Sequence, residues 1–238
     1  MNKIDELSVK IFADGADKAT MMDMNNRPYI KGLTTNPSLM KKAGIKDYSK
    51  FCKEILKEVS TKPISFEVFS DEFDEMEKQA YEISSWGNNV YVKIPVMNTK
   101  KINSYKLIKK LTDDGIKVNV TAVMTMEQIK NTASVLNANV PSYLSVFAGR
   151  IADTGVDPLP IMKDAVDILK FTNKAELIWA SPRELFNIIQ ADKIGCHVIT
   201  VTDSILNKLK MLGYDLDIYS LDTVKMFYKD SIDAGYTI

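Results

Sequence analysis

Short apolar runs recur at regular intervals along this chain and alternate with longer amphipathic stretches. Eight runs are rich in β-branched residues and bounded by polar or turn residues, which is typical of strands buried in a sheet. The stretches between them place apolar residues four positions apart, as at Phe51, Ile55 and Val59, and this spacing predicts helices. The predicted strands are Lys10–Asp14, Gly32–Asn36, Ile64–Phe69, Val90–Val96, Lys117–Val123, Tyr143–Gly149, Glu176–Ser181 and His197–Thr202.

The predicted helices cover most of the remaining chain. Ser181 and Pro182 are expected to begin one of them, because serine is a good N-cap and proline fits the first helical position. The helices are Asp47–Val59, Asp71–Trp86, Lys101–Asp114, Thr125–Asn137, Asp157–Phe171, Pro182–Ala191, Asp203–Leu212 and Leu221–Asp230.

Strand and helix therefore alternate throughout, which requires parallel strands joined by crossover helices. Eight such units predict an α/β protein with a closed (β/α)8 barrel, the TIM barrel. We expect a single domain over residues 1–238, with a C-terminal helix at about 221–230. The alternative is a doubly wound open sheet, which usually has a glycine-rich phosphate loop after its first strand. Only one glycine, Gly15, stands directly after Asp14, so the barrel is favoured.

The composition of the chain mainly argues against certain partners and metal sites. Lys plus Arg and Asp plus Glu number 31 each, so the net charge of zero supports neither nucleic acid nor an anionic membrane as a partner. No apolar run is long enough to span a membrane and the first residues lack an apolar signal core, so we expect a cytoplasmic location. His197 is the only histidine and is expected to pack in its strand, which leaves no histidine-based metal site. Cys52 and Cys196 lie far apart and are expected to be buried rather than disulfide-bonded.

Lys93 lies in the middle of the apolar run Val90–Val96, where a charged residue is unexpected. Burial disfavours the ammonium form of a lysine, so free amine is expected near neutral pH. A free amine in an apolar pocket can attack a carbonyl group and form a Schiff base. The alternative is a lysine whose stem packs on the strand while its ammonium group reaches water.

Other polar residues stand at the carboxyl ends of the predicted strands, where the active site of a (β/α)8 barrel lies. So many polar groups at one end of the strands are costly for a pure core, but they suit a pocket. They are Asp14, Thr34, Thr35, Asn36, Glu67, Lys93, Asn119, Thr121, Ser145, Arg150, Ser181, Arg183, Thr200, Thr202 and Asp203.

Several of these residues have a purely structural alternative. Asp14 could cap a following helix, and Asn36 could belong only to a turn. Glu67 could be an ordinary ion-pair partner of the strand lysine. Arg150 and Arg183 could be surface charges. The combination favours a pocket, because it offers an amine, two carboxylates, hydroxyl and amide groups, and two arginines suited to a phosphate.

With these residues in view, the chain resembles the transaldolase family. The run Thr34-Thr35-Asn36-Pro37-Ser38 is highly specific, and the short length resembles the branch of short transaldolases and fructose-6-phosphate aldolases. The matching segments occur in the family's order and cover nearly the whole chain. They are Phe12–Asp17, Gly32–Leu39, Val92–Pro95, Asn119–Thr121, Ser145–Ile151 and Ala180–Arg183.

The resemblance implies a catalytic role for four residues. Lys93 would form the Schiff base with the C2 carbonyl of a ketose phosphate. Asp14 would take the proton of the C4 hydroxyl as the C3–C4 bond breaks. Glu67 and Thr121 would hold a water molecule that moves protons during imine formation and hydrolysis. The protonated imine accepts the electrons of the broken bond, so no metal and no cofactor are expected.

The resemblance also implies how the substrate is held. Asn36, Asn119 and Ser145 would hydrogen-bond the three-carbon dihydroxyacetone fragment. Thr35 and Phe147 would be further substrate-binding residues.

The phosphate of the sugar would be held by Arg150, Ser181 and Arg183, because a guanidinium group can bond two phosphate oxygens at once. The implied partners are therefore small sugar phosphates. Short relatives form large rings, so a homo-oligomer is also expected.

Two positions distinguish the branches of the family. Fructose-6-phosphate aldolases typically have Gln in place of Glu67 and Tyr in place of Phe147, so both residues favour a transaldolase. The chain departs from the family pattern at Gly15, Ala16, Trp179 and Pro182.

These departures bear on which acceptor sugar is used. The alternatives are an aldolase that releases dihydroxyacetone, a relative acting on another sugar, and a catalytically silent barrel that only binds sugar phosphates. The intact set of Asp14, Glu67 and Lys93 disfavours the silent barrel.

Overall fold

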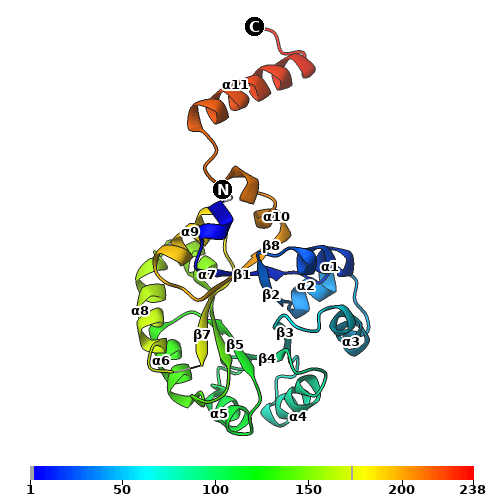
Figure 1. The fold of residues 1–238 in the computed structure, drawn as a ribbon, viewed down its shortest axis with the longest axis vertical. Coiled ribbons are helices and arrows are strands. Elements are labelled where there is room, and N and C mark those ends of the chain that lie inside the picture. The colour runs from blue at the N-terminus through cyan, green and yellow to red at the C-terminus, as the bar shows by residue number, and fades with distance from the viewer. Residues whose placement is uncertain (1–2, 173) are drawn as a thin grey trace.

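A computed structural model describes residues 3–172 and 174–238 of the chain. Residues 1, 2 and 173 of the predicted domain lie outside the described residues. The described chain forms a closed barrel of parallel strands with the order β1 to β8, and the helices surround it (Figure 1). The prediction of a single (β/α)8 barrel is confirmed.

The strands lie where the apolar runs predicted them, with shifts at some ends. The second strand is the clearest case, because Asn36 leaves the strand and caps the helix that follows. The sixth strand ends at Val146, since a helix already begins at Ala148. The strands are β1 (Lys10–Asp14), β2 (Ile30–Thr34), β3 (Ile64–Glu67), β4 (Val90–Pro95), β5 (Val118–Val123), β6 (Ser142–Val146), β7 (Ala175–Trp179) and β8 (Val198–Thr202).

The predicted helices are present, and the described chain also holds helices that the pattern did not reveal, namely α1, α2 and α7. The segment predicted as Asp203–Leu212 is divided into the short helix α10 and the 3-10 turn η2. The α-helices are α1 (Lys18–Asn26), α2 (Pro37–Lys42), α3 (Tyr48–Glu58), α4 (Phe73–Ser84), α5 (Tyr105–Asp113), α6 (Met126–Val135), α7 (Ala148–Asp153), α8 (Leu159–Leu169), α9 (Phe186–Lys193), α10 (Asp203–Leu206) and α11 (Leu216–Asp233). The 3-10 turns are η1 (Lys3–Glu6) and η2 (Leu209–Met211).

The predicted start of a helix at Ser181 and Pro182 is wrong. Ser181 has a φ of +60°, whereas an N-cap residue needs an extended backbone. The helix α9 begins at Phe186 instead. The side chain of Asn187 reaches back and accepts hydrogen bonds from the backbone N–H groups of Arg183 and Glu184.

The inside of the barrel is filled in layers. Phe12, Tyr91 and Tyr143 pack together in its middle, with ring centroids 5.5 Å apart for Phe12 and Tyr143 and 4.4 Å for Tyr91 and Tyr143. A β-carbon on Gly32 would lie only 2.5 Å from the Phe12 ring, so glycine makes room for this aromatic layer. Lys10 and Glu176 form an ion pair, 2.6 Å long, toward the amino ends of the strands. The predicted polar residues lie at the opposite end of the barrel, at the carboxyl ends of the strands.

The outward side chains of the strands pack against the surrounding helices and form the main core. On β4 the residues Val90, Val92 and Ile94 belong to this outer core, whereas Tyr91 contacts the aromatic layer inside. The period of two therefore turns Lys93 into the barrel. Strand β4 therefore has one face in the outer core and one face, with the Lys93 amine, inside the barrel.

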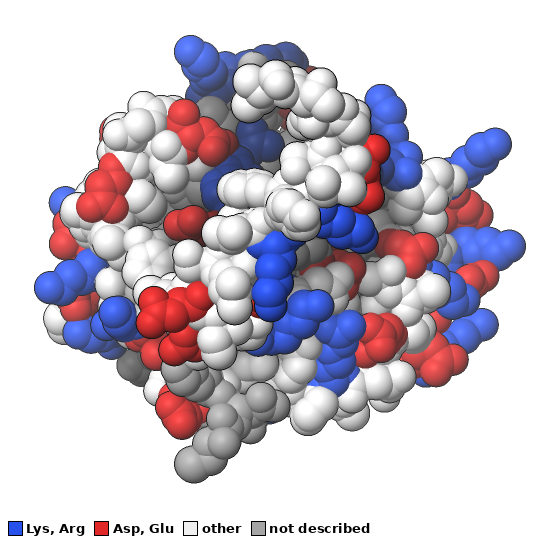
Figure 2. All heavy atoms as spheres, turned by 90° about the horizontal axis from the view of Figure 1, so that it is seen from above, with Lys and Arg blue, Asp and Glu red and all other residues white. Residues whose placement is uncertain are grey.

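The C-terminal helix α11 projects away from the barrel (Figure 1). It spans Leu216–Asp233, longer than the predicted 221–230, because the Asp215 side chain caps its first turn by accepting from the Ile218 N–H at 3.0 Å. None of its residues is buried, and Val224, Phe227 and their apolar neighbours face solvent. Figure 2 shows the face at this end, where uncharged surface lies among scattered residues of both charges. Within the described residues, no helix has the length and apolar character needed to cross a membrane.

Candidate active site

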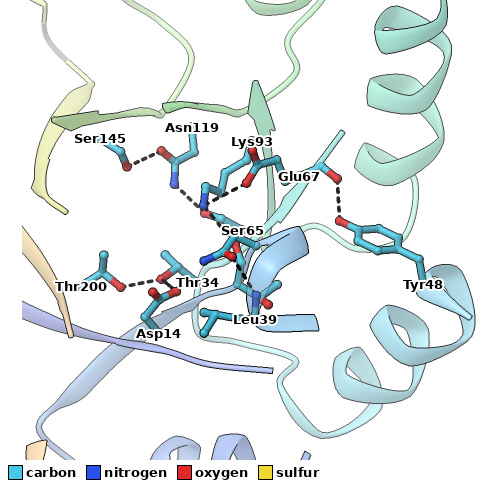
Figure 3. A network of polar contacts seen from close by, with 12 residues as sticks. Asp14, Thr34, Leu39, Tyr48, Ser65, Glu67, Lys93, Asn119, Ser145 and Thr200 are labelled. Atoms are coloured by element: carbon cyan, nitrogen blue, oxygen red, sulfur yellow. Dashed lines mark hydrogen bonds and ion pairs between the residues drawn. The ribbon is translucent and has the colours of Figure 1, made fainter. Parts of the chain in front are cut away.

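Lys93 lies inside the barrel at the carboxyl end of β4, with a residue exposure of 6% (Figure 3). Its Nζ donates a hydrogen bond to the backbone oxygen of Thr35 at 3.0 Å. The carboxylate oxygen Oε2 of Glu67 lies 3.3 Å from the same Nζ. The Lys93 side chain therefore lies within the barrel, where its amine lines a pocket, and not along the outer surface.

Glu67 is held in place by its strand and by Tyr48. The register of β3 and β4 sets Glu67 directly beside Lys93. The Tyr48 hydroxyl donates to the backbone oxygen of Glu67 at 2.6 Å, which fixes the end of β3. The carboxylate is thus aimed at the amine and lines the same pocket.

Asp14 ends β1 on the other side of this pocket (Figure 3). The Thr34 hydroxyl donates to Asp14 Oδ1 at 2.9 Å and also contacts the Thr200 hydroxyl at 2.5 Å. Burial raises the pKa of the Asp14 carboxyl above its ordinary value, and Lys93 and the Thr34 hydroxyl oppose that rise only in part. Asp14 is not a helix cap, because Asp17 takes that position at the start of α1.

A chain of hydrogen bonds links three strands below the pocket. Ser145 Oγ donates to Asn119 Oδ1 at 2.7 Å, and Asn119 Nδ2 donates to Ser65 Oγ at 3.0 Å. Asn119 is fully buried, whereas Ser145 lines the pocket. The amide therefore orients the serine hydroxyl, and the register sets Asn119 beside Lys93.

Strand β5 has an irregular end, with a register shift between Val120 and Val123. Ala122 has a φ of +60° there, and both Thr121 and Ala122 line the pocket. A regular strand would turn one of two successive side chains away. The buried Thr121 Oγ1 has no hydrogen-bond partner within the described part of the chain, so it is available to a water molecule or a ligand.

Of the two polar residues that follow β2, only Asn36 lines the pocket. Its Oδ1 accepts from the Leu39 N–H at 3.0 Å as the N-cap of α2. Thr35 is fully buried and does not line the pocket, although its backbone oxygen accepts the Lys93 hydrogen bond. Thr35 therefore contributes its main chain rather than its hydroxyl group to the site.

The ends of β6 and β7 close the pocket on its far side. Phe147, Arg150 and Ser181 line it, and the Arg150 guanidinium lies 5.7 Å from the centre of the Phe147 ring. Arg183 does not line the pocket, since its guanidinium pairs with Asp153 at the end of α7. Arg150 and Arg183 thus lie on neighbouring elements, but only Arg150 faces the cavity directly.

The resulting cavity has a volume of about 440 Å³. This size suits a sugar phosphate, and the lining offers an amine, carboxylates, hydroxyls and a guanidinium group. The predicted residues that line it are Asp14, Thr34, Asn36, Glu67, Lys93, Thr121, Ser145, Phe147, Arg150, Ser181 and Thr200.

Comparison with known proteins identifies the family of this chain. Residues 11–236 match the family described as Transaldolase/Fructose-6-phosphate aldolase. The chain belongs to this family.

Relatives in the family are similar over most of their length. A "Probable transaldolase" of Thermoanaerobacter sp. (strain X514) is 35% identical over 203 residues, covering 84% of this chain and 89% of the relative. A protein of the same name from Nitrosopumilus maritimus (strain SCM1) is 33% identical, covering 84% and 87%. A solved structure of a candidate lyase/mutase from Burkholderia cenocepacia J2315 superimposes with a TM-score of 0.59 at 11% identity, over 82% of this chain and 76% of that one. This last likeness concerns the fold alone.

The four departures from the transaldolase family pattern lie outside the cavity lining. Trp179 is buried in the core between the strands and the helices, and Ala16 is buried in the same core. Pro182 is a buried residue of the loop that follows β7, and Gly15 follows Asp14 without lining the cavity. None of these four residues lines the cavity, so any effect on the choice of acceptor sugar would act through the neighbouring Asp14 and Arg183.

One polar residue of this transaldolase-family site, Ser65, was missed from the sequence. Ser65 orients Asn119, whereas Thr34 and Thr200, which hold Asp14, were among the predicted strand-end residues. The signal for Ser65 was its spacing of two from Glu67 on a strand, which puts both side chains on one face. Cys52 and Cys196 are free thiols buried in the core, and His197 accepts a hydrogen bond from the Leu177 N–H, in agreement with the predicted packing role.

Proposed function

We propose that this chain is a transaldolase that transfers a dihydroxyacetone unit between sugar phosphates through a Schiff base on Lys93. The observation that carries this proposal is the buried Lys93 amine, 3.3 Å from the Glu67 carboxylate, in one cavity with Asp14. Membership in the transaldolase and fructose-6-phosphate aldolase family supports it. The donor is a ketose phosphate such as fructose 6-phosphate or sedoheptulose 7-phosphate.

Lys93 begins the reaction. Its amine attacks the C2 carbonyl carbon of the ketose phosphate, and loss of one water molecule leaves a protonated imine. Glu67 can take a proton from Nζ at their separation of 3.3 Å. A water molecule between Glu67 and Thr121 would carry protons in this step, which agrees with the buried Thr121 hydroxyl that lacks a protein partner among the described residues.

Asp14 acts next, on the C4 hydroxyl group. It takes the hydroxyl proton, the C3–C4 bond breaks, and its electrons move to the imine nitrogen. An enamine stays on Lys93, and an aldose phosphate leaves. The raised pKa of Asp14 suits this work, because a base whose pKa lies nearer neutral pH can also return the proton.

The second half of the transfer reverses these steps. C3 of the enamine attacks the aldehyde carbon of an aldose phosphate acceptor, and Asp14 gives its proton to the aldehyde oxygen, which becomes the new C4 hydroxyl group. Water then hydrolyses the imine and releases the new ketose phosphate. Asn36 and Ser145 would hold the hydroxyl groups of the three-carbon unit, while Arg150, Ser181 and Arg183 would hold the phosphate.

Transfer is favoured over release of dihydroxyacetone because the aromatic residue at the cavity is Phe147. A phenyl ring offers no hydroxyl group to assist protonation of the enamine, so the enamine persists until an acceptor aldehyde arrives. In an aldolase the enamine would instead be protonated and dihydroxyacetone released.

Borohydride reduction tests the proposal. With fructose 6-phosphate present, we expect a reduced three-carbon adduct on Lys93, located by mass spectrometry of peptides. Lys93→Ala should lose both the adduct and the transfer activity, whereas Lys10→Ala, at the other end of the barrel, should keep the adduct. An adduct on another lysine, or activity in Lys93→Ala, would contradict the proposal. Product analysis with erythrose 4-phosphate as acceptor distinguishes transfer from release.

A further inference from the structure

Arg183 is held at both of its ends. Its backbone N–H donates to Asn187 Oδ1 at 2.7 Å. Its guanidinium faces the Asp153 carboxylate with two parallel bonds, one from Nε to Oδ1 at 2.9 Å and one from Nη2 to Oδ2. This forked arrangement fixes the plane of the guanidinium as well as its position.

The same pair brings two arginines to one short helix. Arg150 and Asp153 both belong to α7, and Arg183 reaches that helix from the loop after β7. The Arg183 Nε also lies beside Gly149, at 3.4 Å from the position that a β-carbon there would take. Asp153 is therefore the only carboxylate bonded to Arg183 in the described chain, and its charge also attracts Arg150.

The forked pair leaves part of Arg183 available. A guanidinium has five N–H donors, of which Asp153 takes one on Nε and one on Nη2. Among the described residues, nothing accepts from the Nη1 group or from the second Nη2 hydrogen, which lie on the other edge of the guanidinium. An anion can therefore bind Arg183 without displacing Asp153.

We propose that Asp153 is a positioning residue for phosphate recognition, holding the Arg183 guanidinium at α7 so that Arg183 and Arg150 bind one phosphate together. Without Asp153, the two like charges would repel and the long Arg183 side chain would move freely. Both effects would have to be overcome each time a phosphate binds. This inference rests on the proposed function, because it takes the substrate to be a sugar phosphate.

The test removes the charge of Asp153 with little change in shape. Asp153→Asn should raise the KM for fructose 6-phosphate about three- to tenfold, the effect of leaving one long side chain unordered. The kcat should change little, and so should borohydride trapping of unphosphorylated dihydroxyacetone on Lys93. Binding of inorganic phosphate, followed by phosphorus NMR titration, should weaken by the same factor. Asp153→Glu keeps the charge and should give a smaller effect.

A double-substitution cycle shows whether Asp153 acts through Arg183. Arg183→Ala should weaken phosphate binding, and adding Asp153→Asn to it should cause no further loss. Asp113→Asn is the matched control, since Asp113 is likewise an exposed carboxylate on a helix, paired with Lys109. It should leave the phosphate titration unchanged.

Three results would overturn the inference. Tighter phosphate binding in Asp153→Asn would mean that Asp153 competes with phosphate for Arg183. Unchanged binding would mean that the pair has no part in recognition, and a further loss in the Arg183→Ala background would mean that Asp153 acts by another route. Trapping on Lys93 tests the proposed function separately, because dihydroxyacetone carries no phosphate. If trapping fails while phosphate binding still depends on Asp153, only the proposed function is wrong.

Discussion

The carbonyl oxygen of Ser181 lies only 1.5 Å from the position that a β-carbon on Gly149 would take. The φ of +60° at Ser181 turns its backbone at this point, and the Gly149 N–H donates to the Ala180 oxygen at 3.4 Å. The end of β7 is thus packed against the first turn of α7 with no side chain between them. Arg150 and Arg183, the two proposed phosphate ligands, directly flank this contact.

Gly149→Ala should destabilise the protein by about 1–3 kcal/mol, because backbone atoms must move to admit the methyl group. The displacement should also raise the KM for phosphorylated sugars. Chemical denaturation measures the loss of stability. Gly15→Ala is the control, since its nearest neighbour would be Met21 Cγ at 4.0 Å, an ordinary contact. Equal stabilities of the two variants would contradict the close approach of Ser181.

Asp14→Asn should abolish transfer yet make the protein more stable at neutral pH. The folded-state pKa of Asp14 is raised by burial, so ionised Asp14 costs stability at pH values above it. Asn mimics the protonated carboxyl group and removes that cost. The melting temperature of the variant should therefore exceed that of the parent protein near pH 7. As pH falls below the raised pKa the difference should shrink, and it should disappear below the ordinary pKa of an aspartate, where Asp14 is protonated in both the folded and the unfolded state.

The pH dependence of the transfer activity should report the ionisation of Asp14 as well. Transfer needs ionised Asp14 to take the C4 hydroxyl proton, so kcat should fall as pH decreases through the raised pKa. A kcat that stays constant well below neutral pH, or a less stable Asp14→Asn variant, would argue against a buried, functional carboxyl group.

Phe147→Tyr should shift the reaction from transfer toward release of dihydroxyacetone. A hydroxyl group at the cavity can assist a water molecule in protonating the enamine, which should raise the ratio of release to transfer at least about tenfold. The ratio is measured by product analysis with fructose 6-phosphate and erythrose 4-phosphate. Phe147→Leu adds no hydroxyl group and serves as the control. If the parent protein already releases dihydroxyacetone as readily as it transfers it, the aldolase is the better description.

The protein is predicted to be a homo-oligomer in which α11 contacts another copy. Phe227 and Tyr228 on this helix are 63% and 69% exposed, and such an apolar surface is unusual for a free helix. Light scattering at micromolar concentration should give a mass above that of one chain. The double variant Val224→Glu with Phe227→Glu should lower the mass, while circular dichroism should keep its helical signal. Lys225→Ala lies on the same helix and should not change the mass, and a monomeric parent protein would disprove the prediction.

The architecture could be predicted from local pattern alone. Each strand is a short apolar run, and side chains alternate between the two faces of a strand. In β4, for example, Tyr91 and Lys93 share one face and Val90 and Val92 share the other. Alternation with helices then leaves few topologies other than a barrel of parallel strands. The position of Lys93 and the polar residues at the strand ends followed from the same pattern, since burial of a lysine in such a run is a local property of the sequence.

Where prediction failed, the deciding contact joined residues far apart in the chain. The start of α9 depends on Ser181, whose backbone is turned where it packs against Gly149, and no local pattern contains that contact. The pairing of Arg183 with Asp153, thirty residues earlier, was not predicted either, because it joins the loop after β7 to α7. Ala122 joins the cavity only because β5 changes register against β6.

The sequence by itself determined the strands, the helices and the type of residue at each strand end, because hydrophobic periodicity and local backbone preferences act over a few residues. Only the tertiary structure decided which of those residues meet. Closing the barrel sets Asp14 of β1, Glu67 of β3 and Lys93 of β4 around one cavity, and the burial of Asp14 there raises the pKa of its carboxyl group. Distances and burial of this kind depend on packing between distant segments, which no local pattern records.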